Sequence, residues 1–82
     1  MVKSITYAPI FQRKFKKIDK SYSEGIKKLI KKIIENPEIG KPMQYERKDT
    51  REVYLSPFRL SYSYDIKTDV LTLLNIYHKD EQ

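Results

Sequence analysis

The 82-residue chain contains no cysteine, no tryptophan and a single histidine. Without cysteine it can form neither a disulfide framework nor a thiolate metal site, and it has no thiol nucleophile. Its stability must therefore come from packing or from a partner, and the composition suits a cytoplasmic protein. A chain this short buries only about two thirds of its unfolded surface and cannot divide its core, so we expect one domain over residues 1–82.

Long apolar runs are also missing. No segment approaches the roughly 20 apolar residues that cross a bilayer, and the opening MVKSITYAPI lacks the charged-then-apolar pattern of a signal peptide. We therefore expect no membrane insertion. The chain is also too short and too sparsely supplied with ligating residues for an enzyme that depends on a metal or an organic cofactor.

Positive charge is in excess and is unevenly distributed. The chain has 17 Lys and Arg against 11 Asp and Glu, which gives a net charge of +6. Residues 1–36 contain ten basic and three acidic residues, whereas residues 37–82 contain seven and eight. The excess therefore lies on the part of the chain with helical periodicity. It is either a solvated face or a positive field that attracts a nucleic acid, and the sequence leaves both interpretations open.

The first third of the chain predicts a strand and a helix. Residues 2–7 are short and partly β-branched, which favours a strand that stops before Pro9. A proline suits the first turn of a helix because its missing N–H is not needed there. This helix is predicted to extend to about residue 18, because apolar residues recur at helical spacing, namely Phe11, Phe15 and Ile18.

A second helix follows a connector over residues 19–23. The segment Ser-Tyr-Ser-Glu at residues 21–24 fits a capping box, in which a hydroxyl and a carboxylate satisfy free amides at a helix start. Asn36-Pro37 ends the helical pattern. Between these limits the apolar residues form one continuous stripe, made of Ile26, Leu29, Ile30, Ile33 and Ile34.

From Met43 onward the hydrophobic period changes to two, which indicates strands. The middle strand alternates, with its large apolar side chains on one face and Arg59, Ser61 and Ser63 on the other. The last strand is apolar on both faces, as expected in the centre of a sheet. The three strands are predicted at residues 51–55, 58–64 and 70–77, with turns at Ser56-Pro57 and residues 65–69.

The order of elements is therefore β-α-α-β-β-β. It predicts an α+β fold in which a helical hairpin packs on one face of a small, mainly antiparallel sheet. The other face stays open, and Arg59 projects onto it from the middle of a strand. Because burial of an unpaired guanidinium is costly, Arg59 needs a function or an ion-pair partner, for which Glu52 and Asp65 are the candidates.

Within this order of elements stand four short segments: Gly40-Lys41-Pro42, Arg51-Glu52-Val53-Tyr54, Phe58-Arg59-Leu60-Ser61-Tyr62 and Ile76-Tyr77-His78-Lys79. Together they resemble a known family, the RelE/ParE toxins of toxin–antitoxin systems, including its YoeB-like branch. The resemblance spans nearly the whole chain, and its most specific motif is an arginine between two apolar residues that leads into a tyrosine. It implies a cytoplasmic toxin that cuts messenger RNA in the ribosome without a metal or other cofactor, and that an antitoxin protein restrains.

The resemblance also implies roles for individual residues. Arg59 matches an arginine expected to bind phosphate or stabilise transition-state charge, and His78 matches the closing histidine of the YoeB-like branch, expected to act as acid or base. Cleavage by a ribose 2′-hydroxyl needs a base, a cation and an acid, so we expect Arg59 and His78 to flank one phosphate. A carboxylate could come from Glu46 or Glu52. The implied RNA-binding residues are Arg47, Lys48, Arg51 and Lys79, and Tyr77 is a further RNA-binding candidate because its ring could stack on a base.

Two other interpretations remain open. A ParE-like gyrase inhibitor would keep the fold but bind a protein, and His78 argues mildly against it because such toxins generally lack an acid–base set. A degenerate, inactive domain would fit the acidic ending Asp80-Glu81-Gln82, where the family tends to be basic. His78 could likewise be a solvent-exposed strand end, and Tyr77 could pack the sheet.

Overall fold

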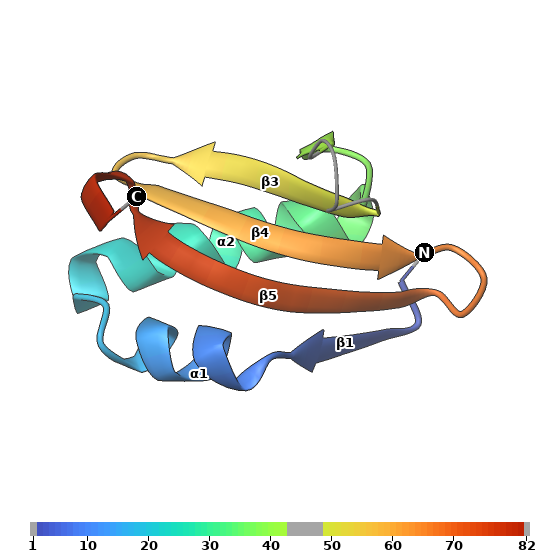
Figure 1. Cartoon of the computed structure of the whole chain (residues 1–82), viewed down its shortest axis with the longest axis horizontal. Helices are drawn as coiled ribbons and strands as arrows, with labels where there is room; N and C mark the ends of the chain where they lie inside the picture. The colour runs from blue at the N-terminus through green and yellow to red at the C-terminus, as the bar shows by residue number, and fades with distance from the viewer. Residues whose placement is uncertain (1, 43–48, 82) are drawn as a thin grey trace.

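The computed structural model describes residues 2–42 and 49–81. Two of the residues expected to bind RNA, Arg47 and Lys48, and the candidate carboxylate Glu46 lie outside the described residues. Two helices and a five-stranded mixed sheet make up the fold (Figure 1). The elements are β1 (Ser4–Tyr7), α1 (Pro9–Lys16), α2 (Lys20–Glu35), β2 (Lys41–Pro42), β3 (Thr50–Leu55), β4 (Phe58–Asp65), β5 (Val70–His78) and the 3₁₀ turn η1 (Lys79–Glu81).

The sheet has the strand order β1-β5-β4-β3-β2. β1 runs parallel to β5, and all other neighbours are antiparallel. The prediction of an α+β fold with a mainly antiparallel sheet is confirmed. The sequence did not predict β2, whose two residues pair with Glu52 and Arg51. A segment of only two residues carries no periodicity from which a strand could be recognised.

Both helices lie where the apolar periodicity predicts them. Pro9 occupies the first turn of α1, and α2 ends at Glu35, immediately before Asn36. The start of α2 differs from the expected capping box, because Asp19 rather than Ser21 caps it. The Asp19 carboxylate accepts a hydrogen bond of 2.9 Å from the Ser21 backbone N–H, which lowers the pKa of Asp19.

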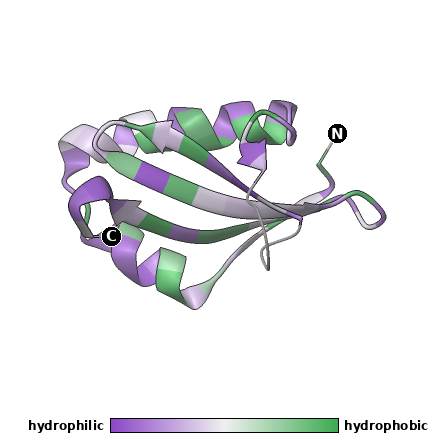
Figure 2. Cartoon of the chain, turned by 45° about the horizontal axis from the view of Figure 1, so that its top comes forward, coloured by the Kyte–Doolittle hydropathy of each residue, from purple (hydrophilic) through white to green (hydrophobic). Residues whose placement is uncertain are grey.

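The core lies between the helices and one face of the sheet. Figure 1 shows α2 crossing behind the strands while α1 lies along β5, beyond the end of β1. Figure 2 shows hydrophobic and hydrophilic residues alternating in the first part of β4, which is the pattern of a strand with one buried face. In the described ranges no helix is long and apolar enough to cross a membrane. The buried apolar residues are Phe11, Ile26, Ile30, Ile33, Leu60, Tyr62, Leu71, Leu73 and Ile76.

A buried tyrosine anchors the segment between α2 and β2. The Tyr62 hydroxyl donates a hydrogen bond of 2.6 Å to the Pro37 carbonyl and accepts one of 2.9 Å from the Gly40 N–H. Burial raises the pKa of Tyr62 because the charged phenolate would be poorly solvated there. A Cβ atom on Gly40 would lie 2.7 Å from the Tyr62 hydroxyl, so the close approach requires glycine. This anchor fixes where β2 joins the sheet.

Candidate functional site

Four polar or aromatic side chains share the face of the sheet opposite α2. Arg59 on β4 is directly opposite Tyr77 on β5 and Tyr54 on β3. Glu52 lies two residues before Tyr54, and residues two apart on a strand point to the same face. The register therefore places a cation, a carboxylate and two phenols next to one another.

Glu52 connects Arg59 to Tyr77. Its Oε1 lies 3.4 Å from Arg59 Nη1, and its Oε2 accepts a hydrogen bond of 2.5 Å from the Tyr77 hydroxyl. The β4 residue opposite Glu52 is Ser61, which is small and buried, so Glu52 and Tyr77 can meet across β4. We call Arg59, Glu52 and Tyr77 the carboxylate cluster.

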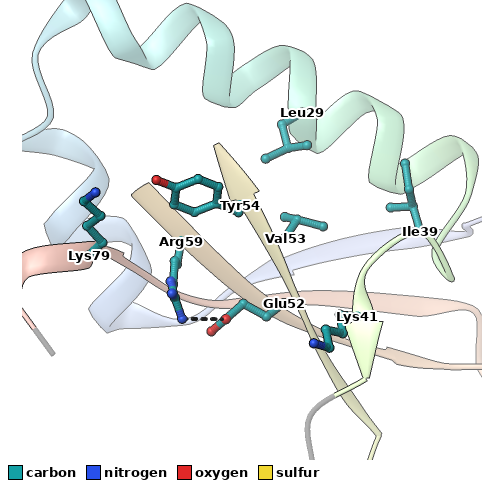
Figure 3. A pocket seen from close by; sticks show the side chains of 8 residues that line it. All are labelled: Leu29, Ile39, Lys41, Glu52, Val53, Tyr54, Arg59 and Lys79. Atoms are coloured by element: carbon teal, nitrogen blue, oxygen red, sulfur yellow. Dashed lines mark hydrogen bonds and ion pairs between the residues drawn. The ribbon is translucent and has the colours of Figure 1, made fainter. Parts of the chain in front are cut away.

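Two members of the carboxylate cluster, Glu52 and Arg59, line a hollow beside the edge of β3 (Figure 3). Lys41 and Lys79 line the same hollow, so among the described residues its three basic side chains exceed its one carboxylate. The Tyr54 ring lies 5.9 Å from the Arg59 guanidinium carbon, within range of a cation–π contact. The Arg59 and Glu52 side chains remain 38% and 22% exposed, so solvent reaches both. An anionic ligand would therefore find accessible positive charge here.

The guanidinium of Arg59 is incompletely satisfied. Its Nε is buried and has no hydrogen-bond partner in the part of the chain that the structure describes. Buried donors are normally paired, so an unpaired one calls for an explanation, and a catalytic role is one. The contact with Glu52 confirms that Arg59 has the acidic neighbour considered from the sequence. A partly exposed pair of this kind contributes no more than about 1 kcal/mol to stability, so it does not by itself explain Arg59.

The structure does not bring His78 to Arg59. His78 pairs with Phe58 at the ends of β5 and β4, so its side chain points to the helix face while Arg59 points to the opposite face. The His78 ring packs edge to face on Phe58 at 5.6 Å, and its Nδ1 accepts a hydrogen bond of 3.2 Å from the Asp80 N–H. The expected arrangement around one phosphate is therefore wrong, whereas a chemical role for His78 stays a prediction.

A β-bulge is the physical reason for this difference. Ser61 pairs with Asn75 and Tyr62 with Leu73, which leaves Leu74 without a partner in the ladder. If side chains simply alternated from Leu73 onward, His78 would point to the same face as Arg59. One extra residue in a strand reverses the faces of all side chains beyond it, so the bulge exchanges the orientations of Tyr77 and His78.

The predicted RNA-binding residues fall in different places. Tyr77 belongs to the carboxylate cluster and Lys79 lines its hollow. Arg51 is directed elsewhere, because its Nη1 donates hydrogen bonds of 3.1 and 2.8 Å to the carbonyls of Glu38 and Gly40. These bonds give Arg51 a structural role beside β2. An RNA contact by any of these residues stays a prediction.

Sequence reasoning missed Lys41 and Tyr54. Tyr54 could have been found, since the two-residue connection Ser56-Pro57 sets the register of the hairpin and places Tyr54 opposite Arg59. No sequence pattern indicated Lys41, because its position depends on the hydrogen bonds between Tyr62 and the segment that leads into β2. Over the described residues, no three His, Cys, Asp or Glu side chains are arranged to hold a metal ion.

Comparison with solved structures places the chain in a known fold class. A chain of the E. coli RelBE toxin–antitoxin complex superposes with a TM-score of 0.80 and 18% identity, covering 90% of this chain and 93% of that one. A chain of the RelBE2 toxin–antitoxin complex of Mycobacterium tuberculosis superposes with a TM-score of 0.83 and 18% identity, over 95% of this chain and 99% of that one. The YoeB/ParE toxin of Agrobacterium tumefaciens superposes with a TM-score of 0.80 and 13% identity, over 92% of this chain and 96% of that one. The fold is that of the RelE/ParE toxin superfamily.

The family model for the ParE toxin of type II toxin–antitoxin systems matches residues 5–82. This match covers almost the whole chain, and the chain therefore belongs to that toxin family. A search of curated proteins found no significant match.

Proposed function

We propose that this toxin is an endoribonuclease that cuts messenger RNA in the ribosome, without a metal or organic cofactor, and so inhibits translation in the cytoplasm. The observation that supports this proposal is the carboxylate cluster, in which Glu52 contacts both Arg59 and Tyr77 beside an open, basic hollow. The three side chains supply the base, the cation and the acid that cleavage by a 2′-hydroxyl requires.

The proposed reaction assigns one task to each residue. Glu52 takes the proton from the ribose 2′-hydroxyl, whose oxygen attacks the adjacent phosphorus. Arg59 stabilises the charge that develops on the phosphorane oxygens, since a guanidinium offers several donors in a fixed plane. Tyr77 donates its proton to the departing 5′-oxygen. The products are a 2′,3′-cyclic phosphate and a free 5′-hydroxyl, and no bond to the protein forms.

The contact between Glu52 and Tyr77 would also reset the site. After one cleavage Glu52 carries an extra proton and Tyr77 lacks one. The hydrogen bond of 2.5 Å between their oxygens offers a direct path for the return of that proton. The two residues would therefore act as a unit, and the role expected of His78 in proton transfer passes to them in this geometry.

The proposed partners are an antitoxin protein, the ribosome and messenger RNA. Two of the similar structures are described as toxin–antitoxin complexes, and these descriptions support an antitoxin for this chain. The excess of basic over acidic side chains in the hollow supports an RNA backbone as ligand. Lys79 and Lys41 would hold phosphates that flank the cleaved one.

A translation extract tests this function directly. Purified toxin is added during synthesis from a defined message, and cleavage is mapped by codon. We expect cuts within codons that the ribosome is reading, and few cuts in the same RNA when ribosomes are absent. Intact message in both reactions would contradict the proposal.

Two observations favour a second candidate, a gyrase inhibitor that acts by binding protein. The matching family model describes ParE toxins, and the sole histidine lies on the opposite face from Arg59. A gyrase supercoiling assay separates the candidates. Under the endoribonuclease proposal, the toxin leaves supercoiling unchanged at concentrations that stop translation.

A further inference from the structure

A second pocket lies at the end of the sheet, where the corner between α1 and α2 meets the start of β4 and the end of β5. Its walls include Tyr22, Phe58, Tyr77 and His78 from three separate elements. Ile18 and Ile76 also line it, so its inner surface is partly apolar. We call this the sheet-end pocket. Of the residues in the carboxylate cluster, only Tyr77 lines the sheet-end pocket.

Aromatic rings define the shape of the sheet-end pocket. The Tyr22 and Phe58 rings meet edge to face at 5.3 Å and 74°, and Phe58 and His78 meet at 5.6 Å and 82°. Tyr22 is 45% exposed although it is large and hydrophobic. Exposed aromatic faces next to apolar surface are suited to stacking a planar group, and nucleobases are stacked in this way in single-stranded RNA sites.

The sheet-end pocket is lined by two basic and two acidic side chains. Lys14 and Lys17 line it, and Lys14 Nζ lies 6.0 Å from the centre of the Tyr77 ring. The pocket also contains two acids, and both have intramolecular partners. Asp19 caps α2 through Ser21, and Asp80 lies 3.5 Å from His78. Both carboxylates keep their charge, so the attraction for a phosphate rests on its direct contact with the Lys14 and Lys17 ammonium groups.

Tyr77 makes the sheet-end pocket continuous with the carboxylate cluster. Tyr77 is one of the residues that line the pocket, and its hydroxyl donates a hydrogen bond to Glu52 on the open face. Arg59 on β4 pairs with Tyr77 on β5. The next pair along the two strands is Phe58 with His78, which lies at the end of the sheet. One step along a strand is about 3.3 Å. An RNA strand with a phosphate at Arg59 could thus pass around the end of the sheet into the pocket.

We propose that the sheet-end pocket binds the base of a nucleotide next to the scissile phosphate, by stacking on the exposed ring of Tyr22, with Lys14 and Lys17 contacting its phosphate. This inference rests on the proposed endoribonuclease function and deepens it. The site adds affinity for unpaired RNA and gives the toxin a preference at one neighbouring position. Its ligand is an unpaired nucleobase with its attached phosphate.

The test measures binding of 2′-O-methyl RNA tetranucleotides, which lack the nucleophile and cannot be cut. Each oligonucleotide is compared with versions from which one base has been removed. For the wild-type protein, removal of one particular base should weaken binding by about 5- to 100-fold, the range expected for one stacked base. Tyr22→Leu should weaken binding of the complete oligonucleotide to the same extent and leave the version without that base unaffected.

Matched controls separate this inference from the proposed function. Tyr7→Leu removes a tyrosine of similar exposure, 41%, from outside both pockets and should change nothing. Arg59→Ala should weaken binding of every oligonucleotide, with or without the base. If Arg59→Ala has this effect but Tyr22→Leu has none, the pocket proposal is wrong and the endoribonuclease proposal stands. If neither variant changes binding and the wild-type protein cuts no RNA in a translation extract, both proposals are wrong.

Discussion

Glu52 and Tyr77 are hydrogen-bonded across β4 although they are 25 residues apart in the sequence. They come from β3 and β5, which are separated by one strand, and the small Ser61 lies opposite Glu52 on that strand. The same carboxylate contacts Arg59. A pair of this kind can hold a proton between two oxygens, and it is the basis of the mechanism proposed for this toxin.

The first prediction concerns cooperation between Glu52 and Tyr77. Glu52→Gln and Tyr77→Phe should each slow RNA cutting by about 10²- to 10⁴-fold, the usual range for one acid–base group. Because the two act as a unit, the double variant should be little slower than the slower single variant. Single-turnover rates on translating ribosomes measure this. Multiplicative losses would show that the residues act independently.

The second prediction concerns His78. Its ring lies on the helix face beside Phe58, so His78→Ala should reduce cutting by less than about 10-fold, well below the loss of an acid–base group. The same kinetic assay measures the effect, with circular dichroism to confirm folding. A loss of about 100-fold or more, with the fold intact, would restore the acid–base role that the family resemblance implies.

The third prediction concerns the close approach of Gly40 to Tyr62. Gly40→Ala would place a methyl group 2.7 Å from the Tyr62 hydroxyl, so we expect a loss of about 1–3 kcal/mol in the free energy of unfolding. Gly25→Ala is the matched control. Its Cβ would lie 3.4 Å from Leu55 Cδ2, and alanine favours a helix interior by about 0.5–1 kcal/mol. Urea unfolding should therefore show the control to be as stable as wild type or more so.

The fourth prediction concerns alkaline pH. Burial raises the pKa of Tyr62, so the unfolded chain releases this proton at a lower pH than the folded protein. The stabilising contribution is complete below the unfolded value of about 10 and is lost as pH rises through the folded value. The free energy of unfolding should thus fall above about pH 10. Tyr62→Phe should be less stable at pH 7, because Gly40 and Pro37 lose their partner, and should show a shallower alkaline decline.

Much of the fold followed from hydrophobic periodicity. The helical stripe that contains Ile26, Ile30 and Ile33 is buried, and alternation in β4 correctly placed Leu60 on the core side. These predictions succeeded because burial of apolar side chains requires a match between sequence period and backbone period. The predicted N-cap of α2, Ser21, lies two residues after the observed one, Asp19. Both residue types cap helices well, and the sequence does not show which of the two does so here.

The candidate site was harder to predict. Arg59 was found because a charged residue interrupts an apolar strand, and Glu52 was among its considered neighbours. The faces of Tyr77 and His78 were not predictable, since β5 is apolar on both sides and its hydropathy does not reveal the bulge at Leu74. Only the pairing with β4 shows which of the two side chains reaches Arg59.

The most direct test of the account is the chemistry of the cut ends and their dependence on Arg59. Message recovered from translating ribosomes is sequenced by methods selective for 2′,3′-cyclic phosphate and 5′-hydroxyl ends, after addition of wild-type toxin or Arg59→Ala. We expect both ends at codons occupied by the ribosome with wild type. With Arg59→Ala we expect at least about a 100-fold loss and an unfolding free energy within about 1 kcal/mol of wild type. Undiminished cutting by a folded Arg59→Ala protein, or ends bearing a 5′-phosphate, would contradict the account.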